Sequence, residues 1–211
     1  VVTVNPRPTL TSSLTPPAIC SNTVFSYSPA SATGGTTFSW NRPAVAGISN
    51  LAATGTGNPN ETLINISFNP INVTYIYTLL ANGCQNIQNV VVTVNPSPTL
   101  TSSLTPPAIC SNTNFSYNPS SATAGTTFAW SRAAVAGISN PAATGFNNPN
   151  EILINTAATA VNVVYVYTLT SNGCSNTQNV TVVVRPRPTL TSSLTPSAIC
   201  SHTFFNYTPT S

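Results

Sequence analysis

The chain repeats a thirteen-residue string at a fixed interval, and this repetition constrains its fold more than any other feature. The string PTLTSSLTPPAIC occupies residues 8–20, returns unchanged at 98–110, and appears again with one substitution at 188–200. The interval of 90 residues holds well beyond the string, because residues 1–90 and 91–180 align without a gap and are identical at 66 positions. Such self-similarity at a fixed period is typical of a tandem array of equal structural units.

The period predicts two complete units and two partial ones. We expect the complete units at residues 5–94 and 95–184. Residues 1–4 are interpreted as the end of a preceding unit, because the letters VVTV recur at 91–94. Residues 185–211 restart the unit and stop, so they are interpreted as the beginning of a further, incomplete one. The chain therefore has the pattern expected of a window from a longer array.

Within each unit the apolar side chains recur at every second position, which indicates β-strands. Val73, Tyr75, Tyr77 and Leu79, for example, alternate with shorter or more polar side chains. Gly-, Pro- and Asn-rich turns separate about seven such runs, and no run has the spacing of a helix. This arithmetic predicts an all-β fold made of immunoglobulin-sized sandwiches. The aromatic positions expected to form the cores are Phe25, Tyr27, Phe38, Trp40, Phe115, Tyr117, Phe128 and Trp130.

The composition excludes several classes of function. Only 3% of the residues are charged, and the net charge of +3 comes from five scattered arginines, which is too sparse to follow a nucleic-acid backbone. No run of about 18 apolar residues could form a membrane-spanning helix. With 41% hydrophobic residues and little net charge, the chain is nevertheless expected to fold.

The residues needed for catalysis or metal binding are almost absent. The chain has no Asp, no Lys and one His, His202, whose equivalents Asn22 and Asn112 indicate a turn residue. General acid–base catalysis needs positioned carboxylates or a tuned His, and calcium needs several oxygen ligands, so we expect neither an enzyme nor a cofactor. The only acidic residues are Glu61 and Glu151, and they are interpreted as ion-pair partners of Arg42 and Arg132. Such a pair would be worth at most about 1 kcal/mol if exposed.

A set of short motifs in fixed order resembles a known family. In the first unit they are AICSNTVFSYSP, TTFSW, VAGISN, NETLIN, VTYIYTLLANGC and VVVTVNP. Together they are similar to the PKD-like, immunoglobulin-like repeat of large Bacteroidota surface proteins, and the similarity covers each whole unit. The resemblance implies a β-sandwich repeated many times in a secreted, cell-surface or filament-forming protein. It implies no ligand, because the acidic stretch that usually follows the Trp in PKD domains is replaced here by NRPAVAG.

Five cysteines without metal-type spacing indicate an oxidising, extracellular setting and disulfides. Regular pairing could join Cys20 to Cys84, and likewise Cys110 to Cys174, within a unit. It could instead join Cys84 to Cys110, or Cys20 to Cys174 across units. In the strand order that the resemblance implies, Cys20 and Cys84 lie at opposite poles, roughly 26–33 Å apart. Because a disulfide needs Cα atoms within about 7 Å, this order favours Cys20 with Cys174. Partners of Cys84, Cys110 and Cys200 would then lie outside the chain, and the within-unit bonds stay an alternative.

Two classes of function fit these features. In the first, the units form an extended, load-bearing rod in an extracellular filament or stalk, with Pro-rich joints such as NPRP acting as stiff connections. The partners would be neighbouring repeats and, through self-association, other copies of the protein. In the second, each unit is an adhesive module that binds glycans or surfaces through its outer face or loops. The free variation of residues 66–71 between units favours the structural class.

Overall fold

The computed structural model describes all 211 residues and contains fourteen strands and no helix, so no helical segment crosses a membrane. The strands of the first repeat are β1 (Ile19–Cys20), β2 (Thr23–Phe25), β3 (Thr37–Arg42), β4 (Ala53–Thr56), β5 (Glu61–Leu63), β6 (Ile71–Ala81) and β7 (Cys84–Asn95). Those of the second repeat are β8 (Ile109–Cys110), β9 (Thr113–Phe115), β10 (Thr127–Arg132), β11 (Ala143–Phe146), β12 (Glu151–Leu153), β13 (Val161–Ser171) and β14 (Cys174–Arg185).

Each repeat is a β-sandwich of one large and one small sheet. In the first repeat the large sheet has the order β1-β7-β6-β3-β4, and β2 pairs with β5 in the small sheet. The second repeat has the same arrangement, β8-β14-β13-β10-β11 with β9-β12. The predicted all-β fold of two tandem sandwiches of about 90 residues is therefore confirmed. By internal contacts the chain divides into two compact units. The first unit consists of residues 1–102, 119–128 and 168–178. The second consists of residues 103–118, 129–167 and 179–211.

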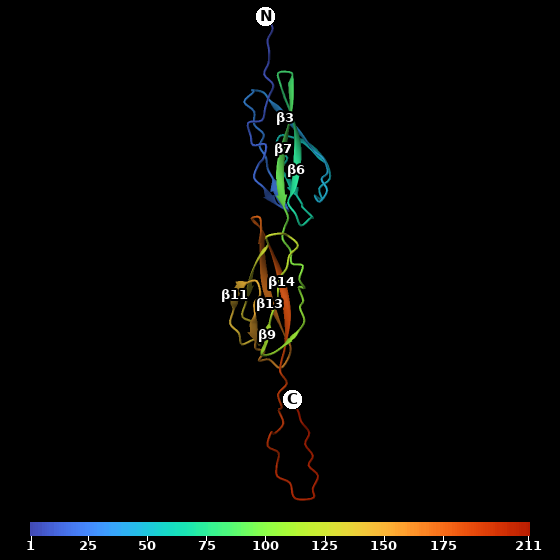
Figure 1. Cartoon of the computed structure of the whole chain (residues 1–211), viewed down its shortest axis with the longest axis vertical. Coiled ribbons are helices and arrows are strands. Elements are labelled where there is room, and N and C mark those ends of the chain that lie inside the picture. The colour runs from blue at the N-terminus through green and yellow to red at the C-terminus, as the bar shows by residue number, and fades with distance from the viewer. The chain divides into compact units, whose positions relative to one another are not determined.

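A long hairpin of β6 and β7 forms the centre of the first sandwich (Figure 1). Its two strands pair antiparallel from Ile71 opposite Val94 to Ala81 opposite Cys84. The turn between them is Asn82–Gly83, and both residues have positive φ, 49° and 78°. Two consecutive residues of positive φ make a type I′ turn, whose twist matches that of the strands. Asn and Gly tolerate this conformation, so the sequence Asn-Gly fixes both the turn and the register.

The core lies between the two sheets and is built from the alternating positions. Val73, Tyr75, Tyr77 and Leu79 are completely buried, whereas the side chains between them face outward. Other buried members of the cluster are Phe25, Tyr27, Trp40, Ile48, Leu63, Val90, Val92 and Val94. The equivalents Phe115, Tyr117 and Trp130 are buried in the second sandwich. Phe38 and Phe128, expected in the core, are only half-buried near the sheet end.

Asparagine supplies most of the left-handed backbone positions. Eight non-glycine residues have positive φ, and seven of them are Asn. Gly57 of the first sandwich is replaced by Asn147 in the second, and both keep positive φ, 63° and 54°. The eighth is His202, with a φ of 68°, at the position of Asn22 and Asn112. The isolated histidine thus occupies the turn position that its equivalents predict.

The repeated string runs beside the last long strand of its sandwich. In the first repeat Asn86 Nδ2 donates to Pro8 O (2.9 Å), Leu10 N donates to Gln88 Oε1 (2.6 Å) and Val91 N donates to Leu14 O (2.9 Å). The string ends in β1, which pairs parallel to the end of β7, with Cys20 opposite Asn95. Only the two-residue β1 of this string forms a regular strand. Side-chain amides make most of its other hydrogen bonds to β7, because the prolines of the string remove backbone donors.

Replacing Gly55 with Ala should destabilise the first sandwich. Gly55 lies opposite Trp40 in the β3–β4 pair, and a Cβ there would lie 2.5 Å from Cζ2 of the indole. Because the indole is buried, it cannot move aside freely, and we expect a loss of about 1–3 kcal/mol in the free energy of unfolding, the usual range for overpacking. Gly34→Ala is the matched control, since its Cβ would meet nothing within 4 Å. Equal denaturation midpoints for the two variants would contradict the prediction.

Candidate functional site

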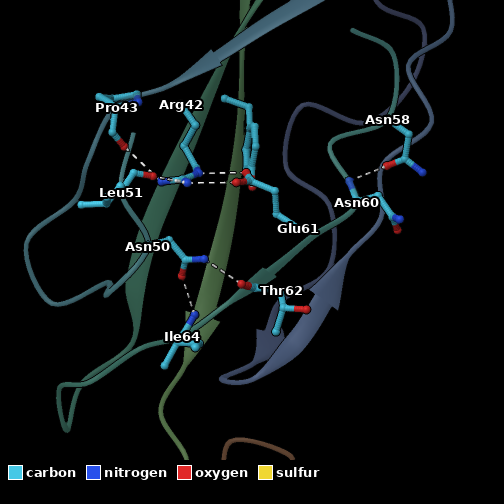
Figure 2. Close-up of polar contacts among 10 residues, drawn as sticks. Arg42, Pro43, Asn50, Leu51, Asn58, Asn60, Glu61, Thr62 and Ile64 are labelled. Carbon is cyan, nitrogen blue, oxygen red and sulfur yellow. Dashed lines mark hydrogen bonds and ion pairs between the residues drawn. The ribbon is translucent and has the colours of Figure 1, made fainter. Parts of the chain in front are cut away.

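An ion pair lies at the boundary between the two sheets of each sandwich. Arg42, the last residue of β3, donates from Nε to Glu61 Oε2 (2.9 Å) and from Nη2 to Glu61 Oε1 (3.0 Å), as Figure 2 shows. The side chain of Arg42 is 1% exposed and that of Glu61 is 18% exposed. The pair predicted from the sequence is therefore brought together as a bidentate, largely desolvated contact, a geometry much stronger than an exposed ion pair.

The remaining donors of Arg42 and the carboxylate of Glu61 have further partners. Arg42 Nη2 also donates to Leu51 O (2.6 Å), which ties the loop after β3 to the pair. Tyr75, completely buried on β6, donates its hydroxyl to Glu61 Oε2 (2.7 Å). The Tyr75 ring in turn packs edge-on against Trp40, with centroids 5.4 Å apart. The network thus connects β3, β5 and β6 and joins the polar cluster to the aromatic core.

The second sandwich repeats this network. Arg132 donates to both carboxylate oxygens of Glu151 at 2.9 Å, and Tyr165 donates to Glu151 Oε2 at 2.6 Å. The guanidinium carbon of Arg132 also lies 6.0 Å from the centroid of the Tyr165 ring. Both acidic residues of the chain are therefore used in these two networks. No cluster of three His, Cys, Asp or Glu side chains could hold a metal ion.

The networks predict how stability depends on pH. Burial alone would raise the pKa of Glu61, but the hydrogen bonds from Arg42 and Tyr75 outweigh it and hold the pKa below its usual value. A depressed folded-state pKa adds stability that is present above the unfolded pKa of about 4.3 and is lost as the pH falls through the folded pKa. Burial, followed by the contact with Glu61, raises the pKa of Tyr75, so its contribution is complete below about pH 10.

We therefore expect a constant free energy of unfolding between about pH 5 and pH 9, and a decline below pH 4. Urea denaturation at a series of pH values measures this dependence. Glu61→Gln should remove the acid dependence of the first sandwich and leave that of the second. An acid decline of unchanged size in the first sandwich would show that another group is responsible.

A second polar cluster centres on Asn65, whose side chain is held at four points. Its Nδ2 donates to Val94 O and Asn69 O, both at 2.8 Å, and its Oδ1 accepts from the backbone N and the Oγ of Ser67, both at 2.8 Å. Asn65 is 6% exposed. Its backbone also exchanges bonds with the hydroxyl of Ser21, next to Cys20. The cluster fixes the loop after β5 to the end of β7. Asn155 repeats it in the second sandwich except for the hydroxyl bond, because Ala157 replaces Ser67.

Two further asparagines satisfy backbone groups where no strand continues the small sheet. Figure 2 shows Asn50 donating from Nδ2 to Thr62 O (2.8 Å) while its Oδ1 accepts from Ile64 N (2.9 Å), as a neighbouring strand would. Asn58 Oδ1 similarly accepts from the backbone N of Tyr27 and of Asn60. Many sheet proteins protect their edges with charged side chains. In this nearly uncharged chain, the amide side chains of Asn50 and Asn58 instead form hydrogen bonds with the backbone groups at these edges.

The structure joins Cys20 to Cys174 by a disulfide, with Cα atoms 5.6 Å apart and a sequence separation of 154 residues. Both cysteines belong to the same compact unit, and Asn95, opposite Cys20, donates from Nδ2 to Asn172 O beside Cys174 (3.1 Å). Cys84, Cys110 and Cys200 are free. Cys20 and Cys84 lie at opposite ends of β7, about 36 Å apart at the usual rise per residue, so this fold does not accommodate a bond between them.

One hydrogen bond next to Cys84, which is half-buried, matches one next to the buried Cys174. Asn5 Nδ2 donates to Asn82 O (3.1 Å), just as Asn95 donates to Asn172, and Cys84 Sγ lies 3.6 Å from Asn5 O. The hydrogen bond from Asn95 to Asn172 beside the disulfide therefore has an equivalent next to a thiol that has no disulfide partner in this chain.

Sequence reasoning missed several residues of these clusters. Tyr75 was recognised only as an alternating position of a predicted strand, and no structural hydrogen-bonding role was assigned to Asn50, Asn58 or Asn65. Each of the four is nevertheless identical in the second repeat, as Tyr165, Asn140, Asn148 and Asn155. Their identity was a usable signal, but in a chain with 66 identical positions it does not distinguish them from the others. Their roles depend on which backbone groups the fold leaves without partners, and this follows only from the three-dimensional arrangement.

Solved structures of similar fold have low sequence identity to the chain. They include the I-band fragment I67–I69 of titin (8% identity, TM-score 0.42, 87% of this chain and 66% of that one) and extracellular domains 3–5 of Drosophila OTK (12%, 0.41, 85% and 62%). A third is human protocadherin-24 EC1-2 (11%, 0.43, 88% and 100%). The chain thus spans about two thirds of the length of the titin fragment. No curated protein sequence matches the chain.

The family model of the PKD-like domain matches residues 17–98 and 107–188, one copy in each sandwich. Domains of this kind are typical of extracellular structural or adhesive repeats and typically have no catalytic role, and disulfides are likewise typical of oxidising, extracellular settings. These two matches cover most of the chain, which therefore belongs to the PKD-like domain family.

Proposed function

We propose that the chain is a non-catalytic, load-bearing part of a secreted filament or cell-surface stalk, of the kind its resemblance to Bacteroidota surface repeats implies. One observation carries this proposal: a disulfide spans 154 residues, more than one 90-residue repeat, and so holds together more of the chain than a single sandwich. A bond confined to one domain would stabilise that domain alone. A bond that reaches into the following repeat maintains the connection between repeats.

The polar groups of each sandwich support the same proposal. The acidic side chains, the buried arginines and the clustered asparagines have partners inside the fold, and no convergent set of free ionisable groups remains for a ligand. The adhesive alternative would need a common binding surface. The segment at residues 66–71, ISFNPI, which is mostly exposed, becomes TAATAV at 156–161, which makes it a poor candidate.

We also propose that the three free cysteines pair with cysteines of other repeats. Cys84 is equivalent to Cys174 by the 90-residue period, and Cys110 and Cys200 are equivalent to Cys20. The preferred partners would be neighbouring repeats, or other copies if the protein self-associates. Non-reducing peptide mapping of native protein should then find Cys84 and Cys110 in disulfides with cysteines of such repeats.

Immunogold labelling of intact, unpermeabilised producing cells tests the proposed function. Label along extracellular filaments or stalks is expected. Label that appears only after permeabilisation would overturn the proposal. Glycan-array binding by the purified chain at micromolar concentration would favour the adhesive alternative.

A further inference from the structure

We propose that the disulfide reroutes tension, so that a pull on the two ends of the chain bypasses residues 21–173. Force follows the shortest covalent path, and Cys20 is bonded directly to Cys174. The load then passes through residues 1–20, the disulfide and residues 174–211. This inference rests on the proposed load-bearing function and adds to it which parts of the chain carry the load.

The segment before the disulfide is already close to extended. From Pro8 to Cys20 it accompanies β7 from Asn86 to Asn95, held by the bonds described above. Nine strand residues rise about 31 Å, and twelve residues of the string cover that distance, so each advances about 2.6 Å. The maximum is roughly 3.3–3.6 Å per residue, which leaves only about 1 nm of slack in the segment.

The segment after the disulfide begins with a fully extended strand. Cys174 is the first residue of β14 and Arg185 is the last, so force enters at one end of the strand and leaves at the other. A strand at about 3.3–3.4 Å per residue cannot lengthen much further. Tension can therefore run along β14 without separating it from β13 and β8, and the second sandwich has no reason to unfold.

The path also gives a physical role to the repeated string. Residues 8–20 connect the chain to the disulfide, and residues 188–200 continue the path beyond β14. The string at 98–110 lies inside the bypassed loop and ends at Cys110, which is free in this chain. It makes the same contacts along β14 as the first string makes along β7, including Asn176 Nδ2 to Pro98 O and Leu100 N to Gln178 Oε1.

Single-molecule force spectroscopy of the complete chain, held by tags at its two ends, tests this inference. The oxidised chain should reach a contour length of about 19–21 nm, which is the length of its 58 unbypassed residues. No additional contour length should be released before the disulfide breaks. The Cys20→Ser/Cys174→Ser variant should reach about 70–76 nm, roughly 3.6 times as long.

A variant with Cys84→Ser, Cys110→Ser and Cys200→Ser is the matched control, since it keeps the disulfide and removes the thiols that could exchange with it. It should match the oxidised chain. If the oxidised chain or this control releases an additional 51–55 nm without bond rupture, the bypass is wrong. That result would leave the extracellular role intact, whereas label inside the cell would overturn the proposed function and leave the contour lengths unchanged.

Discussion

Replacing Glu61 with Gln should lower the free energy of unfolding of the first sandwich by about 3 kcal/mol. Arg42 would stay buried at 1% exposure without a negative partner, and Tyr75 would lose its charged acceptor. Removing one member of a buried pair typically costs 3–5 kcal/mol, and the 18% exposure of Glu61 places the expected loss at the lower end. Few single changes that preserve shape should matter as much to this domain.

Each sandwich contains one tryptophan, so the two can be followed separately. Trp40 fluorescence in a Trp130→Phe background reports urea unfolding of the first sandwich, and Glu151→Gln is the matched control that should leave this signal unchanged. The double variant Arg42→Met/Glu61→Leu should recover part of the loss, because it removes the unpaired charge. Recovery should be incomplete, because Leu51 O also loses its donor. A Glu61→Gln loss below 1 kcal/mol would contradict the buried-pair interpretation.

Replacing Asn65 with Ala should cost about 2–4 kcal/mol in the same sandwich. The substitution removes the donor that Asn65 supplies to Val94 O and the acceptor of the backbone N of Ser67, and a buried group that loses its bond costs about 1–3 kcal/mol. The variant Asn65→Asp distinguishes the loss of the amide donor from the loss of side-chain volume. It keeps the shape and the acceptor for Ser67 but places an oxygen against Val94 O, so it should be as destabilising as Ala at pH 7.

Asn69→Thr is the matched control for this prediction. Asn69 is exposed, and its backbone carbonyl, not its side chain, receives the bond from Asn65. Thr is already present at the equivalent position, Thr159, which accepts the same bond from Asn155. The control should unfold at the denaturant midpoint of the unmodified chain. If Asn65→Asp were as stable as the unmodified chain, the amide donor would have no structural importance.

The architecture could be predicted because it depends on local and periodic signals. The 90-residue period, the alternation in residues 73–79 and the Asn-Gly turn at 82–83 each specify backbone geometry within a short segment. The aromatic alternation also identified most core positions. Phe38 and Phe128 differ because they lie near the end of the sheet, where alternation indicates a face but not how much of that face is covered.

The depth and composition of the polar clusters could not be predicted in this way. The sequence predicted the ion pair of Arg42 with Glu61. The burial of that pair, however, depends on Tyr75 from β6 and on the loop that contains Leu51. The small sheet likewise exposes backbone groups that Asn50 satisfies, and such a requirement appears only when the sheet ends are known. The two partners in each of these bonds are separated by 9 to 19 positions, so no local pattern connects them.

The long disulfide loop also affects how the chain survives a protease. A single cut in any exposed loop between residues 21 and 173 would leave two fragments that remain covalently joined through Cys20 and Cys174. In a chain that continued the same pairing every 90 residues, consecutive loops would overlap by 64 residues, since 154 exceeds the period by that amount. Along the overlapping loops, one broken peptide bond would not sever the molecule. For a chain with the extracellular location proposed above, where damaged molecules cannot be resynthesised in place, such redundancy would preserve continuity after damage.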